Sequence, residues 1–185
     1  MAQEPSLAPL LAADEIQSRV RELAAEINGC YGVGTVPHLV SVLKGSFVFL
    51  VDLMRALSRP VTIDFVAMTS YGGATGPSHE PRLLKDLEQD IAGRDVLVVE
   101  DIVDTGQTLF WLLNRLRERY PRSLRTVALL NKPSRRAVSV EIDHFGFTVE
   151  DRFVVGYGLD YAERYRHLPY FCSLRTGDLK GPGYI

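Results

Sequence analysis

Apolar residues follow helical and strand spacings in turn along the chain, which predicts an α/β fold. In Asp14 to Asn28 the apolar positions recur at helical spacing, with Asp14 as the expected N-cap and Gly29 as the stop. Leu39 to Leu43 has the apolar run of a buried strand, and a helix should open at Gly45 and Ser46 and continue through Leu57. Val61 to Met68 supplies a second β-rich run. The first third of the chain therefore predicts a helix followed by a strand, helix, strand unit.

The second half repeats the pattern. Val96 to Val99 is a continuous apolar run, typical of a strand buried on both faces of a parallel sheet. A helix over Gln107 to Tyr120 and a strand over Val127 to Leu130 should follow. Val138 to Leu174 has short aromatic and β-branched runs, which indicate extra strands or a small hood over the sheet. Leu7 to Ala13 is apolar but short, and we interpret it as a loose leader.

One long loop interrupts this order. Tyr71 to Pro81 contains three glycines and two prolines, so it can hardly form a helix or a central strand. We expect this loop to move.

Composition narrows the class of protein. A chain of 185 residues with 46% apolar and 24% charged residues is typical of a single globular domain. The net charge of −2 gives no reason to expect nucleic-acid binding, and no apolar run has the length of about 18 residues that a membrane helix needs. Cys30 and Cys172 are far apart and outside any zinc-type cluster, which favours a reducing, cytoplasmic location.

The densest chemistry follows the strand that begins at Val96. The run leads directly into Glu100, Asp101 and Asp104, and a Thr-Gly turn then opens the next helix. Carboxylates at the end of a buried strand are unfavourable without partners, and ligands of open α/β sheets bind at that end. A Thr-Gly turn at a helix N-terminus can present N–H groups to a phosphate. Together they indicate a ligand with a diol, a phosphate and Mg²⁺.

A plainer interpretation exists for each acid. Asp104 could cap the following helix, while Glu100 and Asp101 could be solvated at the strand end. Three acids clustered beside the turn favour a site, since they repel one another unless a ligand uses them. The chain has neither a GxxxxGK[ST] P-loop nor a complete Rossmann glycine fingerprint.

The segment VLVVEDIVDTGQTL, residues 96–109, resembles the phosphoribosyl pyrophosphate (PRPP) motif of the type I phosphoribosyltransferases, and its EDIVDTG form resembles the hypoxanthine-guanine branch. The likeness extends over most of the chain, through Leu43-Lys44-Gly45, Ser70-Tyr71, Leu84-Lys85-Asp86, Lys132, Phe153 to Tyr157 and Asp160-Tyr161. It implies one domain over residues 1–185, with an open, parallel-rich sheet flanked by helices. The core would span roughly residues 30–150, and the N-terminal and C-terminal segments would form the hood.

The resemblance also implies residue roles. Glu100 and Asp101 would hold the ribose hydroxyls, and Asp104 would be the general base near N7 of the purine. A non-proline cis peptide is implied between Leu43 and Lys44. The PRPP-binding set would be Lys44, Gly45, Glu100, Asp101, Asp104, Thr105, Gly106, Gln107, Thr108 and Arg166.

A second set would bind the purine, and it comprises Lys132, Phe153, Val154 and Asp160. The Lys132 ammonium has only donors, so it suits the 6-oxo group of hypoxanthine or guanine and not the 6-amino group of adenine. Without the resemblance, Lys44 and Lys132 would pass for surface lysines and Asp160 and Arg166 for surface charge, and Phe153 would be as readily core as ligand shelf.

The resemblance further implies a cofactor, a lid and an assembly. Mg²⁺ would be held by Glu100, Asp101 and Asp160, and the loop that includes Ser70 and Tyr71 would close over the reaction. The product would be IMP or GMP, formed by a homodimer or homotetramer. Phe47, Phe49 and Leu53 could line an interface or the core. The alternatives are a nucleotide-sensing regulator with a nucleic-acid partner and a phosphoribosyltransferase for another base.

Overall fold

A six-stranded sheet in the order β4-β3-β2-β5-β6-β7 forms the centre of the computed structural model, which describes residues 6–68 and 82–174. Strands β3, β2, β5, β6 and β7 pair in parallel with their neighbours in this order. Strand β4 lies at the edge of the sheet and pairs with β3 in the antiparallel direction. The sheet strands are β2 (His38–Leu43), β3 (Thr62–Met68), β4 (Leu83–Lys85), β5 (Asp95–Val103), β6 (Ser123–Asn131) and β7 (His144–Thr148). The prediction of an open, parallel-rich sheet is confirmed.

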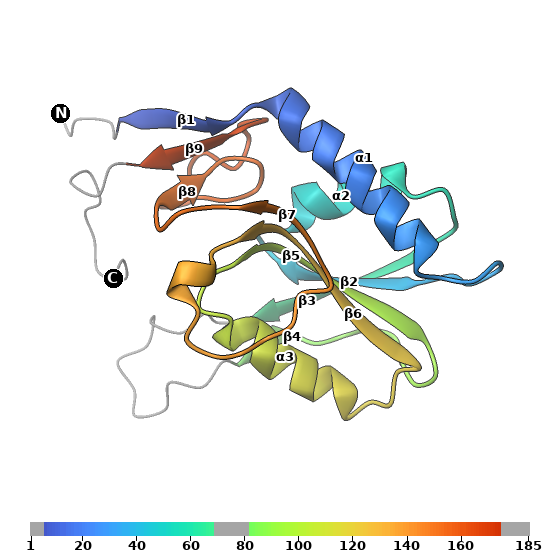
Figure 1. Cartoon of the computed structure of the whole chain (residues 1–185). Helices are drawn as coiled ribbons and strands as arrows, with labels where there is room; N and C mark the ends of the chain where they lie inside the picture. Colours follow the sequence, from blue (N-terminus) through green and yellow to red (C-terminus); the bar gives the residue numbers. More distant parts are fainter. Residues whose placement is uncertain (1–5, 69–81, 175–185) are drawn as a thin grey trace.

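Helices cover both faces of this sheet. Helices α1 (Ala13–Gly29) and α2 (Phe47–Ala56) lie on one side, and α3 (Gln107–Arg117) lies on the other (Figure 1). Strand β5 shows why, because its successive side chains alternate between the two faces. Leu97 and Val99 pack in the cluster that contains α1 and α2, whereas Val96 and Val98 pack against α3.

A smaller sheet forms the hood. Its order is β1 (Leu7–Leu11), β9 (Phe171–Leu174) and β8 (Phe153–Val155), all antiparallel (Figure 1). The loose leader predicted over Leu7 to Ala13 was wrong, because Leu7 pairs with Leu174 and Pro9 with Cys172. The local pattern could not reveal a partner so distant in sequence. Pro9 is tolerated because β1 is an edge strand.

The hood and the central sheet share one hydrophobic core. Val154, Tyr157 and Phe171 of the hood belong to the same buried cluster as Leu39 of β2. Helix α1 also packs in this cluster, through Ile16, Val20 and Leu23. Phe49 and Leu53 are fully buried core residues, whereas Phe47 is 40% exposed.

The elements expected from the apolar pattern are present with shifted ends. Helix α1 begins at Ala13 with Ala12 as the N-cap, so Asp14 lies in the first turn instead of capping it. Helix α3 ends at Arg117, before the predicted end at Tyr120. The predicted loop from Tyr71 to Pro81, with the lid residues Ser70 and Tyr71, lies outside the described residues. Within the described ranges, every helix is too short or too polar to cross a membrane.

The chain order creates a switch point between β2 and β5. From β2 the sheet continues to β3 on one side, while β5, β6 and β7 extend it on the other. The ladder between β2 and β5 runs from His38 and Val96 to Ser41 and Val99, and β5 continues beyond it to Val103. Ligands of open α/β sheets bind at the carboxyl ends of strands beside such a point.

A buried aspartate on β3 fixes this strand to the segment that follows β4. Asp64 on β3 is 4% exposed and accepts hydrogen bonds from the N–H groups of Phe65 at 2.7 Å, Glu88 at 2.7 Å and Gln89 at 3.2 Å. Burial alone would raise the pKa of Asp64, but these donors and Lys85 outweigh it and lower that pKa.

We predict that Asp64→Asn destabilises the fold by about 2 to 3 kcal/mol at neutral pH, because an amide cannot satisfy all these donors. Because the pKa of Asp64 is lowered in the native state, its carboxylate stabilises the fold at pH values above 3.8, the ordinary pKa of an aspartate. This stabilisation is lost as the pH falls through the native pKa. The gap between wild type and variant should therefore narrow in acid. Urea unfolding at several pH values measures it, and Asp90→Asn at an exposed position is the control. Equal losses from both variants would contradict the prediction.

Candidate active site

The turn from β2 into α2 lies directly against the end of β5. A Cβ atom on Gly45 would overlap the carboxylate of Asp101, and a Cβ atom on Gly158 would overlap the carbonyl oxygen of Gly45. The Leu43–Lys44 peptide bond is cis, as the resemblance implied. Three distant segments thus meet at the switch point, and both glycines are needed because their neighbours leave no space for a side chain.

Glu100 and Asp101 share an environment that opposes their charge. Glu100 is 6% exposed, and burial together with the nearby charge of Asp101 raises its pKa well above the usual range. Burial likewise raises the pKa of Asp101 to about 6, although the N–H of Ile102 donates a hydrogen bond of 2.7 Å to its carboxylate. Two acids with raised pKa values at a strand end form a cluster that a cation or hydroxyl groups would stabilise.

The third acid, Asp104, faces cations from the loop after β6. Its Oδ1 lies 3.3 Å from Arg135 Nε, and its Oδ2 lies 3.8 Å from Lys132 Nζ. The buried Oδ1 accepts no hydrogen bond from the residues that the structure describes. Asp104 does not cap α3, since the N-cap is Gly106. The two cations orient the carboxylate, with one oxygen facing each of them.

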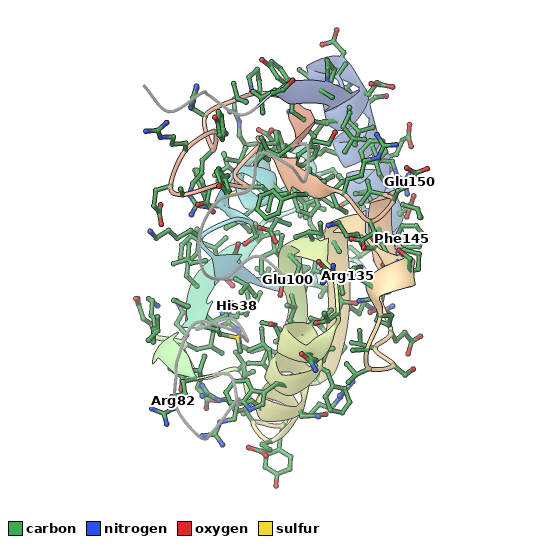
Figure 2. The ribbon with its side chains drawn as sticks, turned by 90° about the vertical axis from the view of Figure 1, so that its left-hand side faces the viewer. His38, Arg82, Glu100, Arg135, Phe145 and Glu150 are labelled. Atoms are coloured by element: carbon green, nitrogen blue, oxygen red, sulfur yellow. The ribbon has the colours of Figure 1, made fainter. Side chains whose placement is uncertain are left out.

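Sequence reasoning missed the contribution of Arg135 and Arg136. Arg135 belongs to the short 3-10 helix η1 (Pro133–Arg135), and Figure 2 shows it at the level of Glu100, below the hood. Arg136 donates a hydrogen bond of 3.0 Å to the carbonyl of Asp104. The only signal was a pair of arginines after Lys132-Pro133, which by itself indicates surface charge.

The Thr-Gly turn has the geometry of an anion site. Gly106 has φ 82°, and a Cβ atom there would crowd Val140 and Arg136. Its left-handed backbone lets the chain enter α3 directly after Thr105, whose hydroxyl oxygen accepts a bond of 3.4 Å from the N–H of Gln107. The first N–H groups of a helix have no backbone partners within it, so Thr108 can present its N–H to a phosphate, and Gln107 can do so by giving up its long bond to Thr105.

Lys132 connects this acid end to the hood. It is 6% exposed, and its ammonium donates a 2.6 Å hydrogen bond to the carbonyl of Arg152, directly before β8. Burial lowers the pKa of Lys132, and the charge of Asp104 opposes that shift. On β8, the rings of Phe153 and Tyr161 pack edge to face with their centroids 5.8 Å apart, and Val154 is buried. Lys132 is therefore a buried, hydrogen-bonded lysine and not a solvated loop lysine.

The hood contributes a second charged group around Arg166. Its Nη2 lies 2.8 Å from Asp160 Oδ1, and its Nη1 donates a 2.8 Å hydrogen bond to the carbonyl of Gly158. Because Gly158 contacts Gly45, Arg166 is held beside the β2–α2 turn that carries Lys44. The structure therefore brings Lys44 and Arg166, two members of the expected PRPP-binding set, to one region.

Carboxylate oxygens at this site match the ligand preference of Mg²⁺. Within the described residues, no group of three or more His, Cys, Asp or Glu side chains is arranged to hold a metal by itself. Glu100 and Asp101 still suit a Mg²⁺ ion that takes its other oxygens from substrate and water, since Mg²⁺ is usually bound by one or two carboxylates.

We predict that Asp101→Asn stabilises the ligand-free fold by about 1 to 3 kcal/mol at neutral pH. Because the pKa of Asp101 is raised in the native state, ionisation of this carboxyl group lowers the free energy of unfolding. The loss grows as the pH rises from 3.8 to about 6 and is constant above that pH. The gain should therefore disappear near pH 4 and reach its full size above about pH 6. Thermal unfolding across this range measures it, with the exposed Glu141→Gln as control. A loss of stability at neutral pH would contradict the prediction.

Comparison with known proteins identifies the family. Residues 8–162 match the model of the phosphoribosyl transferase domain. The hypoxanthine-guanine phosphoribosyltransferase of Mycobacterium avium is 50% identical, with 89% of this chain and 84% of that protein covered. The protein of the same name from Bacillus subtilis is 45% identical, with 90% and 92% covered.

Solved structures agree. The crystal structure of a hypoxanthine phosphoribosyltransferase from Staphylococcus aureus superposes with a TM-score of 0.87 at 40% identity, covering 94% of each chain. With an acid pair at the switch point, a glycine turn against it and relatives of this similarity, the chain belongs to the phosphoribosyltransferase family, in its hypoxanthine-guanine branch.

Proposed function

We propose that this protein is a purine salvage enzyme that joins hypoxanthine or guanine to PRPP, giving IMP or GMP and pyrophosphate. The observation that carries this proposal is the meeting of the Glu100–Asp101 pair, the Gly45 turn and the N-terminus of α3 at the switch point. Each part suits a different piece of PRPP, and the family supplies the reaction.

Each group of PRPP has suitable partners. Glu100 and Asp101 would accept hydrogen bonds from the ribose hydroxyls, and a bound diol and cation would stabilise the ionised carboxylates, whose pKa values are raised mainly by burial. The 5′-phosphate would bind at the start of α3. Pyrophosphate would bind between the backbone at Gly45 and the side chains of Lys44 and Arg166. The residues around the 5′-phosphate are Thr105, Gly106, Gln107 and Thr108.

Mg²⁺ is proposed as the cofactor. Bound with PRPP, it would neutralise charge on the leaving pyrophosphate. Glu100 and Asp101 would hold it through their oxygens, and Asp160 would contribute through water, since its Oδ1 is paired with Arg166.

Asp104 is proposed as the general base. Its carboxylate, which faces Lys132 and Arg135, would accept the proton from N7 as N9 of the purine attacks C1′ of the ribose. Arg135 would orient the carboxylate from the loop side, and the nearby acids would stabilise positive charge on the ribose.

Lys132 is proposed to select the base. Its ammonium already donates to a carbonyl in the ligand-free state, at 2.6 Å from Arg152 O. The 6-oxo group of a purine is an acceptor of the same kind, whereas a 6-amino group would present a donor to it. Phe153 would stack on the purine, and the backbone of Val154 would meet the ring edge.

Assembly and location stay predictions. Phe47 and Val51 lie one helical turn apart on α2 and are each 40% exposed, which supports an apolar contact with another copy in a dimer or tetramer. Both cysteines are free, which is compatible with the expected cytoplasmic location.

The activity is tested directly by an ultraviolet assay with PRPP, Mg²⁺ and each of hypoxanthine, guanine, xanthine and adenine. We expect turnover with hypoxanthine and guanine, and a kcat/KM for adenine lower by about 10⁴ or more, because the site would leave polar groups unpaired. Use of adenine as efficiently as hypoxanthine would reject the role of Lys132, and failure of every base would reject the function.

Asp104→Asn tests the general base. Positioned base catalysis contributes about 10² to 10⁴ in rate, so kcat should fall by that factor with a modest change in KM. The variant keeps the shape of the side chain, and circular dichroism can verify the fold. Asp151→Asn, which removes the other carboxylate paired with Arg135, is the matched control and should keep most of the activity. Near-normal turnover of Asp104→Asn would remove the assignment.

A further inference from the structure

Glu163 occupies both cations that the proposed function assigns to pyrophosphate. Its Oε1 lies 3.0 Å from Lys44 Nζ, and its Oε2 lies 3.3 Å from Arg166 Nη2. Each carboxylate oxygen thus takes one cation, which is how two oxygens of a bound phosphate would divide them. The hydrogen bonds and charges of Lys44 and Arg166 lower the pKa of Glu163, so its carboxylate is ionised at neutral pH.

The backbone aims this carboxylate at the cations. Tyr161 and Arg164 form an isolated antiparallel bridge, and the two residues between them, Ala162 and Glu163, have φ 52° and 61°. Glycine and asparagine usually fill two-residue turns of this kind, since other side chains are strained there. Asp160 Oδ2 accepts a 2.8 Å hydrogen bond from the N–H of Glu163 and keeps the turn closed. Strained turns that tertiary contacts maintain are common at ligand clamps.

The ion pairs are easy to exchange. The side chains of Glu163 and Lys44 are 67% and 66% exposed, so water screens their attraction and the pair is weak. Pyrophosphate carries more charge than one carboxylate and would displace it. Arg166 keeps its 2.8 Å contact with Asp160, so the exchange can leave that side chain in position.

We infer that Glu163 is an internal stand-in for pyrophosphate: it neutralises Lys44 and Arg166 in the free enzyme, is displaced when the pyrophosphate group binds, and returns as that group leaves. This inference rests on the proposed function. The carboxylate therefore weakens pyrophosphate binding and helps release the product.

The alternative is that Glu163 orients the two cations for binding. The two roles have opposite signs. If Glu163 competes with pyrophosphate, removing its charge strengthens binding, whereas if it orients the cations, the same change weakens binding.

The test is calorimetric titration of the full-length protein with magnesium pyrophosphate, for wild type and Glu163→Gln. The control is Glu118→Gln, because the Glu118 side chain is similarly exposed at 65% and pairs with Arg115 on α3. We expect Glu163→Gln to bind about two- to fivefold more tightly, the range of one or two exposed ion pairs, and Glu118→Gln to match wild type. The difference should shrink at about 1 M salt, where charges are screened within about 3 Å.

Unchanged or weaker binding by Glu163→Gln would overturn the inference. Suppose that wild type binds magnesium pyrophosphate and turns over purine, and that Glu163→Gln binds magnesium pyrophosphate with the same affinity. This result would leave the proposed function intact and reject only the role of Glu163. Absence of both pyrophosphate binding and turnover in wild type would reject both.

Discussion

Two adjacent carboxylates at the end of a central strand, Glu100 buried and Asp101 half-buried, are the constraint on which the site depends. Burial raises the pKa values of Glu100 and Asp101, and the charge of Asp101 adds to the shift of Glu100, so this end of β5 is unfavourable until a ligand supplies hydroxyls or a cation. The surrounding backbone is shaped to them: Gly45 leaves room for Asp101, and Gly158 in turn fits against the carbonyl of Gly45. One pair of acids thereby sets the contact between the central sheet and the hood.

The other charges of the site are already paired in the free protein. Lys44 lies beside Glu163, Arg166 beside Asp160, and Asp104 between Lys132 and Arg135. Under the proposed function, substrate binding would be an exchange of partners, in which phosphate and purine oxygens replace carboxylates and carbonyls of the chain. Such an exchange would keep the cations in position without leaving them unpaired, and it would moderate affinity, which favours release of the products.

Prediction from the sequence succeeded where one segment carried the whole signal. The apolar run before Glu100 specified a strand buried on both faces, and the Thr-Gly turn specified where α3 begins. It failed where the decisive partner was distant. Nothing near Leu7 indicates that Leu174 completes its strand, and nothing near Arg135 indicates that Asp104 lies beside it. Lys132 resembled a surface lysine for the same reason, although it is almost fully buried.

The sequence alone determined the α/β class, the order of strands and helices, and the motif that identifies the family, because hydrophobic period and turn chemistry are local properties. Only the tertiary structure decided which side chains share one environment. The crossing order of β2 and β5 brings Gly45 to Asp101, and the return of the chain through the hood brings Glu163 to Lys44. Charge, burial and pKa depend on distances through space, so residues far apart in the chain acquire their chemistry only when the sheet and hood have closed around them.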